Sequence, residues 1–147
     1  MSSFSEDLLK SLMFKEEQEI IPILTDESDE DDYQTKYPEI LPILPLKNAV
    51  LFPGVVIPIT VGREKSIQLI REYNRRDKII GTATQRDSKI EDPQMGDLFP
   101  VGTIAQIVKI IEMPDGSTSV IIHGKRRIRF EEQIANDPYL ICKRSQL

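Results

Sequence analysis

The chain has 147 residues, 39% of them hydrophobic, one cysteine and a formal net charge of −5 at pH 7. This length fits one domain, or one domain with a tail, and allows burial of about two-thirds of the unfolded surface. The charge argues against nucleic-acid binding by the whole chain, and the single cysteine excludes an intramolecular disulfide. Since neither a signal peptide nor an apolar run of the ~20 residues that span a bilayer is present, we expect a cytoplasmic protein without membrane contact.

Residues 1–39 are expected to form a tail. Ser3 and Glu6 have the spacing of a helix capping box, which allows a short amphipathic helix that would be marginal in isolation. Acidic residues dominate the segment 26–32, and their mutual repulsion predicts a largely disordered linker. An acidic decoy or a cation site is the alternative, but the segment lacks the glycine and the spaced glutamate of an EF-hand loop.

Short apolar runs follow, and prolines interrupt them. Pro42 and Pro45 cannot donate to a sheet ladder, so the first run should lie at a sheet edge or at the end of a strand. The pair Pro53-Gly54 should form a turn. The apolar runs in this part, candidates for strands, are residues 41–46, 49–52 and 55–61.

One amphipathic helix is expected over residues 63–76, because Ile67, Ile70 and Tyr73 recur at helical spacing among charged residues. The polar stretch 85–97 should be a loop. A hairpin is predicted at Pro114-Asp-Gly116. The strands expected around these features are residues 78–84, 102–113, 117–123, 125–133 and 139–144. Many short strands with a single helix predict a mainly β (α+β) domain built as a small β-barrel or folded sheet.

The sequence offers little catalytic chemistry. It contains neither a phosphate-binding glycine loop nor a Gly-x-Ser-x-Gly elbow, and nothing singles out a pair of carboxylates. One histidine and one cysteine cannot build a Cys/His zinc site. His123 and Cys142 could form a nucleophile–base pair, but we favour a packed cysteine and a surface or strand-end histidine. No catalytic, cofactor-binding or metal-binding residue is therefore expected.

A basic cluster lies between residues 125 and 129. Strand alternation puts Lys125, Arg127 and Arg129 on one face, where they could contact phosphates. We favour a charged strand face paired with acids such as Glu131, because the net charge is negative and no aromatic residues are interleaved. Nucleic acid is therefore not an expected partner.

Bulky apolar side chains beside turns are better candidates for a binding site. They lie in the segments 51–55 and 95–100. Apolar surface marks protein-binding sites, and methionine adapts to varied partners. The alternative is that Phe52 and Phe99 plug the core, as aromatic residues beside turns often do. The candidate contacts for a protein substrate are Leu51, Phe52, Met95, Leu98 and Phe99.

An ordered set of segments resembles a known family. The set comprises Leu41-Pro-Ile-Leu-Pro-Leu-Lys47, Val50-Leu-Phe-Pro-Gly54, Val56-Ile-Pro58, Val61-Gly-Arg63, Ser66, Val101-Gly-Thr-Ile-Ala105, Met113-Pro-Asp-Gly116, Gly124, Arg127 and Arg129. Each element is weak alone, but their order and spacing are specific. From about residue 40 to residue 147 the chain resembles the substrate-binding domain of Lon proteases.

The resemblance implies a small PUA-like β-barrel lobe over residues 40–147, truncated before a helical lobe. In the family an AAA+ ATPase and a Ser–Lys peptidase follow, so ATP and Mg²⁺ would belong to the parent protein and not to these residues. The implied role is non-catalytic: to help recognise and deliver unfolded, damaged or regulatory proteins, and to support assembly with its own subunits into a ring, usually a hexamer. The alternatives are a standalone adaptor or sensor with this fold, and a PUA-like nucleic-acid binder.

Overall fold

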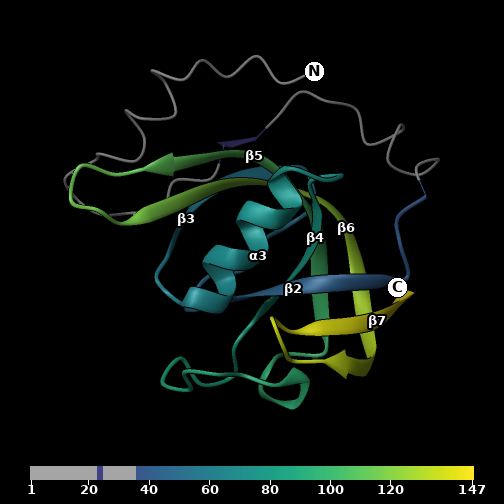
Figure 1. Ribbon diagram of the computed structural model, residues 1–147. Helices are drawn as coiled ribbons and strands as arrows, with labels where there is room; N and C mark the ends of the chain where they lie inside the picture. The colour runs from purple at the N-terminus through teal and green to yellow at the C-terminus, as the bar shows by residue number, and fades with distance from the viewer. Residues whose placement is uncertain (1–22, 25–35) are drawn as a thin grey trace.

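The computed structural model describes residues 23–24 and 36–147 (Figure 1). The described part is mainly β with one α-helix, as predicted. Its elements are β1 (Ile23–Leu24), β2 (Ile40–Leu46), β3 (Val55–Val61), α3 (Glu64–Asn74), β4 (Ile79–Thr84), the 3₁₀ helix η1 (Met95–Asp97), β5 (Val101–Glu112), β6 (Thr118–Ala135) and β7 (Ile141–Gln146). The helix predicted near Ser3 and the acidic linker lie outside the described residues.

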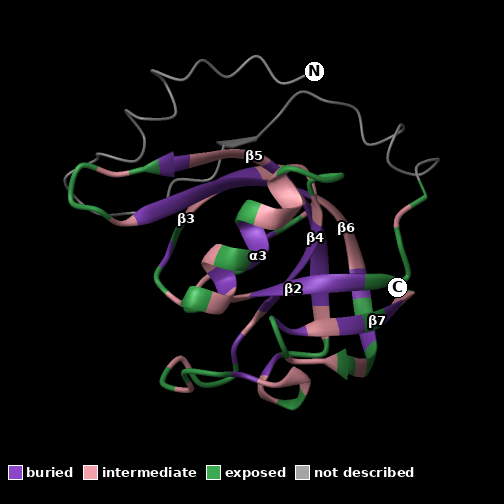
Figure 2. Cartoon of the chain, in the orientation of Figure 1, coloured by how far each residue is buried: buried purple, intermediate pink, exposed green. Residues whose placement is uncertain are grey.

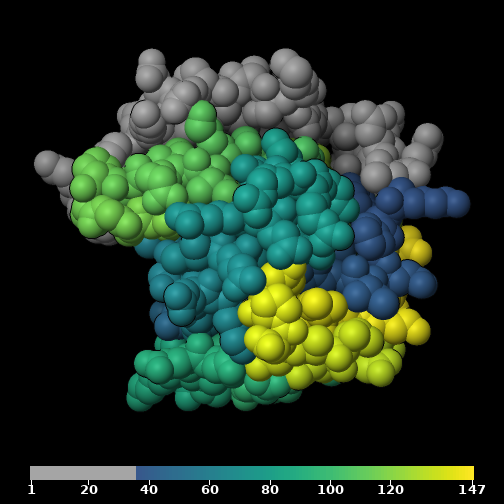
Figure 3. Space-filling model, viewed as in Figure 1, coloured from purple at the N-terminus to yellow at the C-terminus, as the bar shows by residue number. Residues whose placement is uncertain are grey.

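The strands form one sheet that closes on itself. Its order is β1-β3-β6-β5-β4-β2-β7, and β7 pairs a second time, with β6. The strands β6, β5, β4, β2 and β7 therefore form a ring, and β3 and β1 extend from β6 as an arm. Only β2 and β4 pair in parallel; the other pairs are antiparallel. The β5–β6 hairpin projects at the upper left of the view, and the segment 85–97 lies at the bottom (Figures 1 and 3).

The prolines of β2 predicted a sheet edge or a strand end. The strand lies inside this ring and not at an edge, whereas Pro45 does lie next to the last residue of the strand. Its first part, Ile40–Pro42, pairs with β7, whereas its second part, from Ile43 to Leu46, pairs with β4. Each half of the strand thus has one hydrogen-bonded neighbour. A proline has no N–H to donate to a neighbouring strand. Each of the two prolines can be accommodated in this interior strand if its nitrogen faces the side on which no strand pairs.

Strand β6 is a single strand of 18 residues where the sequence suggested two. Its first part pairs with β3 and β5, and its second part with β5 and β7. The expected break was Gly124, which instead lies within the strand. A Cβ there would lie 2.2 Å from the carbonyl oxygen of Phe52, so glycine is needed for the close approach of another segment. A register shift against β5 at the same point bends the strand.

Helix α3 covers one opening of the folded sheet. Leu69 and Ile70 are fully buried, and Ile67 and Tyr73 are partly buried against the same core cluster, which also receives residues from β2 to β6. A second cluster fills the part of the ring between β2, β5, β6 and β7. It contains Leu41, Ile43, Ile104, Ile128, Phe130, Leu140 and Cys142. Buried residues follow the strands in Figure 2, and the exposed ones gather at turns and at the outer face of the helix.

Candidate functional site

The segment 47–54 connects β2 to β3 and carries the first candidate residues. It is irregular, with positive φ at Asn48 and Gly54. It is nevertheless held firmly, because it hydrogen-bonds to three neighbouring strands, β4, β5 and β6. The anchors are Thr84 Oγ1 donating to the Ala49 carbonyl at 2.6 Å, Thr103 Oγ1 to the Leu51 carbonyl at 2.7 Å, and the Gly54 amide to the Gly124 carbonyl at 2.8 Å.

Within this anchored segment, two adjacent side chains differ in burial. Leu51 is buried in the main core, whereas Phe52 is 51% exposed. The guanidinium of Arg127, on β6, lies 5.8 Å from the centroid of the Phe52 ring. That distance is within the range of cation–π attraction.

The second candidate segment repeats this arrangement. Leu98 is buried, and Phe99 is 47% exposed. The Arg86 guanidinium lies 5.2 Å from the centroid of the Phe99 ring, and its Nε donates to the Leu98 carbonyl at 3.1 Å. The Phe99 amide donates to the Thr84 carbonyl at 2.9 Å. Thr84, the last residue of β4, therefore forms hydrogen bonds with both candidate segments.

The five predicted contact residues thus divide into two groups. Leu51 and Leu98 fill the core, and Met95 is half-buried against it. Phe52 and Phe99 do not plug the core, contrary to the alternative interpretation, because the preceding leucines occupy that space. Arg86 and Arg127 were not among the candidates, although the outward face predicted for Arg127 was a usable signal. We call Phe52 with Arg127, and Phe99 with Arg86, the two phenylalanine–arginine pairs.

Two of the four residues of the basic cluster lie beside aromatic rings. Strand alternation holds in its second half, where Ile128 and Phe130 are buried and Arg129 is exposed. Arg126 lies 5.0 Å from the centroid of the Tyr37 ring, and Arg127 belongs to the first phenylalanine–arginine pair. These contacts place two of the arginines of the strand beside aromatic rings.

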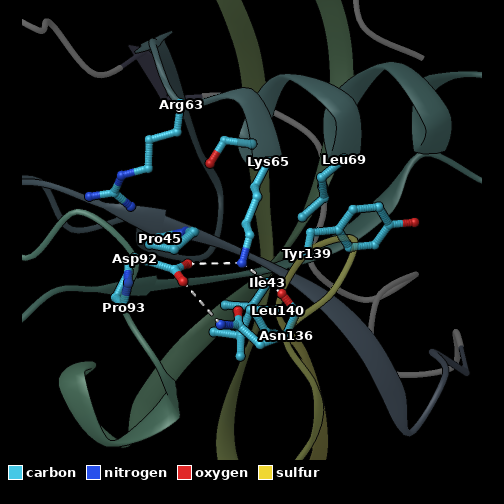
Figure 4. A pocket seen from close by; sticks show the side chains of 11 residues that line it. Ile43, Pro45, Arg63, Lys65, Leu69, Asp92, Pro93, Asn136, Tyr139 and Leu140 are labelled. Atoms are coloured by element: carbon cyan, nitrogen blue, oxygen red, sulfur yellow. Dashed lines mark hydrogen bonds and ion pairs between the residues drawn. The ribbon is translucent and has the colours of Figure 1, made fainter.

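A shallow pocket lies at the amino-terminal end of α3 (Figure 4). Lys65 Nζ donates to Asp92 Oδ1 at 3.0 Å and to the Asn136 carbonyl at 2.8 Å. Arg63 donates through Nη2 to the Ile90 carbonyl at 3.0 Å and to the side-chain oxygen of Gln85. These bonds tie the segment 85–97 to the helix, and Lys65 also ties the turn before β7. The side chains lining the pocket are therefore largely engaged in holding segments together.

Arg63 is the most desolvated cation in this pocket. Burial lowers its pKa, although Asp92 and Glu91 act in the opposite direction. Its Nε is buried without a hydrogen-bond partner among the described residues. The guanidinium nevertheless stays protonated at physiological pH. The pocket combines this positive charge with the Lys65–Asp92 salt bridge.

His123 and Cys142 lie in different parts of the sheet. His123 pairs with Val56 and Gln106, and Cys142 with Leu41 and Gln133. The expectation of a packed cysteine is confirmed, whereas His123 is buried in the middle of β6 and not at the surface or at a strand end. Within the described residues, no group of three or more His, Cys, Asp and Glu side chains could hold a metal ion. No described helix is long and apolar enough to cross a membrane.

Comparison with known families decides the identity of this fold. Residues 40–147 match the model of the ATP-dependent protease La (LON) substrate-binding domain. The chain belongs to this family. Among curated proteins it is 46% identical over 129 residues to the Lon protease of Cytophaga hutchinsonii, and 46% identical over 134 residues to that of Flavobacterium johnsoniae. These matches cover 88% and 91% of the chain but only 16% of each relative.

Solved Lon structures share the fold. The N-terminal domain of Lon protease from the Mycobacterium avium complex has a TM-score of 0.58 at 21% identity, covering 74% of this chain and 54% of its own. The Lon N-terminal domain protein from Xanthomonas campestris has a TM-score of 0.59 at 26% identity, covering 72% of this chain and 58% of its own.

The segments that carried the Lon resemblance mostly build the fold. The run 41–47 contains β2, and the run 50–54 forms the anchored segment that bears Phe52. Arg63 holds the segment 85–97, and Gly124 makes room for the Phe52 carbonyl. In this Lon substrate-binding domain the family pattern therefore specifies the support of the phenylalanine–arginine pairs.

Proposed function

We propose that this chain is the non-catalytic part of a Lon protease that recognises unfolded or damaged proteins, and that Phe52 and Phe99 contact them. The observation that carries the proposal is the pair of half-exposed phenylalanines, each stacked beside an arginine. Both belong to segments that hydrogen-bond to Thr84 at the end of β4. Membership of the Lon substrate-binding family supports a protein as the ligand.

The chemistry of the two pairs suits such ligands. Unfolded chains expose apolar side chains that folded proteins bury, and an exposed aromatic ring offers a large rigid contact for them. The neighbouring guanidinium groups can donate to backbone carbonyls or carboxylates of the bound chain. Neither interaction requires a particular sequence, and quality control of many proteins needs that tolerance.

The rest of the proposed function concerns the parent protein. The chain would deliver its ligands to an AAA+ ATPase that uses ATP and Mg²⁺ and to a serine peptidase in the cytoplasm. It would also support assembly of the subunits into a ring, which we propose is a hexamer. The 46% identity to Lon proteases of which it spans 16% supports these proposals.

The contact role is tested by titrating the 147-residue chain into a fluorescently labelled, cysteine-alkylated unfolded test protein and measuring anisotropy. Phe52→Ala and Phe99→Ala should each weaken binding about fivefold to thirtyfold, the range expected for an aromatic contact residue. Ile134→Ala is the matched control, because Ile134 is 47% exposed like Phe99 but belongs to the end of β6. It should bind like the unaltered chain.

Two results would argue against the proposal. If the unaltered chain does not bind the unfolded protein even at high concentration, the role fails for this domain. If it binds and all three variants bind equally, the ligand contacts another surface and the two phenylalanines are not its contacts.

A further inference from the structure

Among the described residues, most of one side of strand β3 has no paired strand. It pairs along its length with β6, from Val56 to Val61. On its other side it pairs only with the two residues of β1, at Val55 and Val56. Within the described part of the chain, no strand pairs with the outer side of β3 beyond Val56. All the other strands of three or more residues have neighbours on both sides in at least part of their length.

Pro58 shows which backbone groups face outward. In an antiparallel ladder, facing residues alternate between pairs that exchange hydrogen bonds and pairs that do not. Pro58 faces Ile121 of β6 and has no N–H, so this pair cannot be one that exchanges hydrogen bonds. Its carbonyl therefore points away from β6, and alternation gives Val56 and Thr60 the same orientation. The outer side thus offers the Thr60 amide and the Pro58 and Thr60 carbonyls.

We infer that this outer side of β3 binds an extended segment of the protein substrate as an added strand. The inference rests on the proposed function and names its recognition mode. The antiparallel pairing of β1 with the start of β3 shows that this edge can bind another segment of main chain. Main-chain hydrogen bonds depend little on sequence, so strand addition suits a domain that binds many unfolded proteins.

The edge is also limited in a way that suits transient binding. Pro58 removes one outward donor, which weakens strand addition and protects the edge against aggregation. Because β1 occupies the start of the edge, a substrate strand either continues from Val56 towards Val61 or displaces β1. At the same end, the Val55 amide donates to the Phe52 carbonyl at 3.2 Å, so β3 begins directly after the segment that carries the first phenylalanine–arginine pair.

The test is the same anisotropy titration with Thr60→Pro and Thr60→Val in the 147-residue chain. Thr60 is exposed, and proline removes its outward amide, whereas valine keeps the amide and changes the side chain. We expect Thr60→Pro to weaken binding about fivefold, the effect of one lost hydrogen bond, and Thr60→Val to bind like the unaltered chain. Equal affinity of the two folded variants would overturn the inference and leave the proposed function intact. If the unaltered chain does not bind, the proposed function itself fails.

Amide hydrogen exchange on the unaltered chain keeps the inference testable if Thr60→Pro does not fold. Saturation with the unfolded protein should slow exchange of the Thr60 amide at least severalfold. Unchanged exchange at Thr60 while the probe is bound would overturn the inference. Slowing that depends on the concentration of the chain alone, without the probe, would assign the edge to a second copy and would also overturn it.

Discussion

Phe52 and Phe99 each directly follow a buried leucine, and side chains hydrogen-bond to the carbonyl of each leucine. Thr103 holds the carbonyl of Leu51, and the Arg86 side chain holds that of Leu98. Both bonds fix backbone that has no regular periodicity. A substitution of a residue that supports one of these segments should therefore also change the position of the phenylalanine side chain in that segment.

Gly124 is the most demanding of these supports. A methyl group there would meet the Phe52 carbonyl at 2.2 Å, and backbone cannot yield as a flexible side chain can. We expect Gly124→Ala to lower the free energy of unfolding by about 1–3 kcal/mol in urea titrations. Gly62→Ala is the control, because a methyl group at Gly62 would have no heavy atom within 4 Å apart from those of its two chain neighbours. It should change stability by less than about 1 kcal/mol. Equal stability of the two variants would contradict this account of Gly124.

Cys142 gives a prediction about pH. Burial raises the pKa of its thiol from the ordinary 9.0 to about 11, because the thiolate would be desolvated. Between these two pKa values the thiol is protonated more often in the folded state than in the unfolded state. The contribution of the thiol to the free energy of unfolding is therefore fully present below pH 9 and is lost as the pH rises towards 11. In urea titrations across this window, Cys142→Ala should lose less stability than the unaltered chain, by on the order of 2 kcal/mol. Parallel curves would show that the thiol does not titrate in this way.

At the residue scale, the sequence singled out two candidate segments but could not give the orientation of their side chains. Leu51 and Phe52 are equally apolar neighbours in an irregular segment, so no alternation distinguishes the inner from the outer one. His123 was misplaced for a related reason. One polar residue in an apolar strand suggests the surface, and only the pairing of β6 with strands on both sides shows that the position is buried.

At the scale of elements, the segment 47–54 depends on two threonines. Thr103 is buried and its hydroxyl is bonded to the Leu51 carbonyl, so Thr103→Val would leave that carbonyl without this donor. We expect a loss of about 1–3 kcal/mol in thermal or urea unfolding, together with weaker binding of the unfolded protein. Thr60→Val, at an exposed position, should change stability by less than about 0.5 kcal/mol. A Thr103→Val protein as stable as this control would show that the anchor is dispensable.

The regular elements were largely predictable. Helix α3 was expected over residues 63–76 and spans Glu64–Asn74, and β3 matches its apolar run. The errors concern elements whose partners are distant in sequence. The prolines of β2 suggested an edge because the division of its pairing between β7 and β4 cannot be seen locally. Gly124 suggested a break because the approaching Phe52 lies far away in the chain. The run 49–52 forms part of an anchored loop and not a strand.

At the scale of the whole molecule, the closed ring explains how a domain of this kind can present irregular segments rigidly. Five strands close on one another, and within this ring β4 pairs with β5 over residues 79–82 and with β2 over residues 81–84. Phe52 and Phe99 are carried there by hydrogen bonds and not by core packing of their own rings. The family assignment supports a protein as the ligand that we propose for this surface.

The most direct test of this central claim is an amide NMR titration of the isotope-labelled 147-residue chain with an unfolded test protein, and with the same protein folded. The account predicts shifts that gather at residues 50–54 and 98–100 with the unfolded form, and much smaller ones with the folded form. Shifts that are absent at high concentration, that are equal for both forms, or that lie only elsewhere would contradict it.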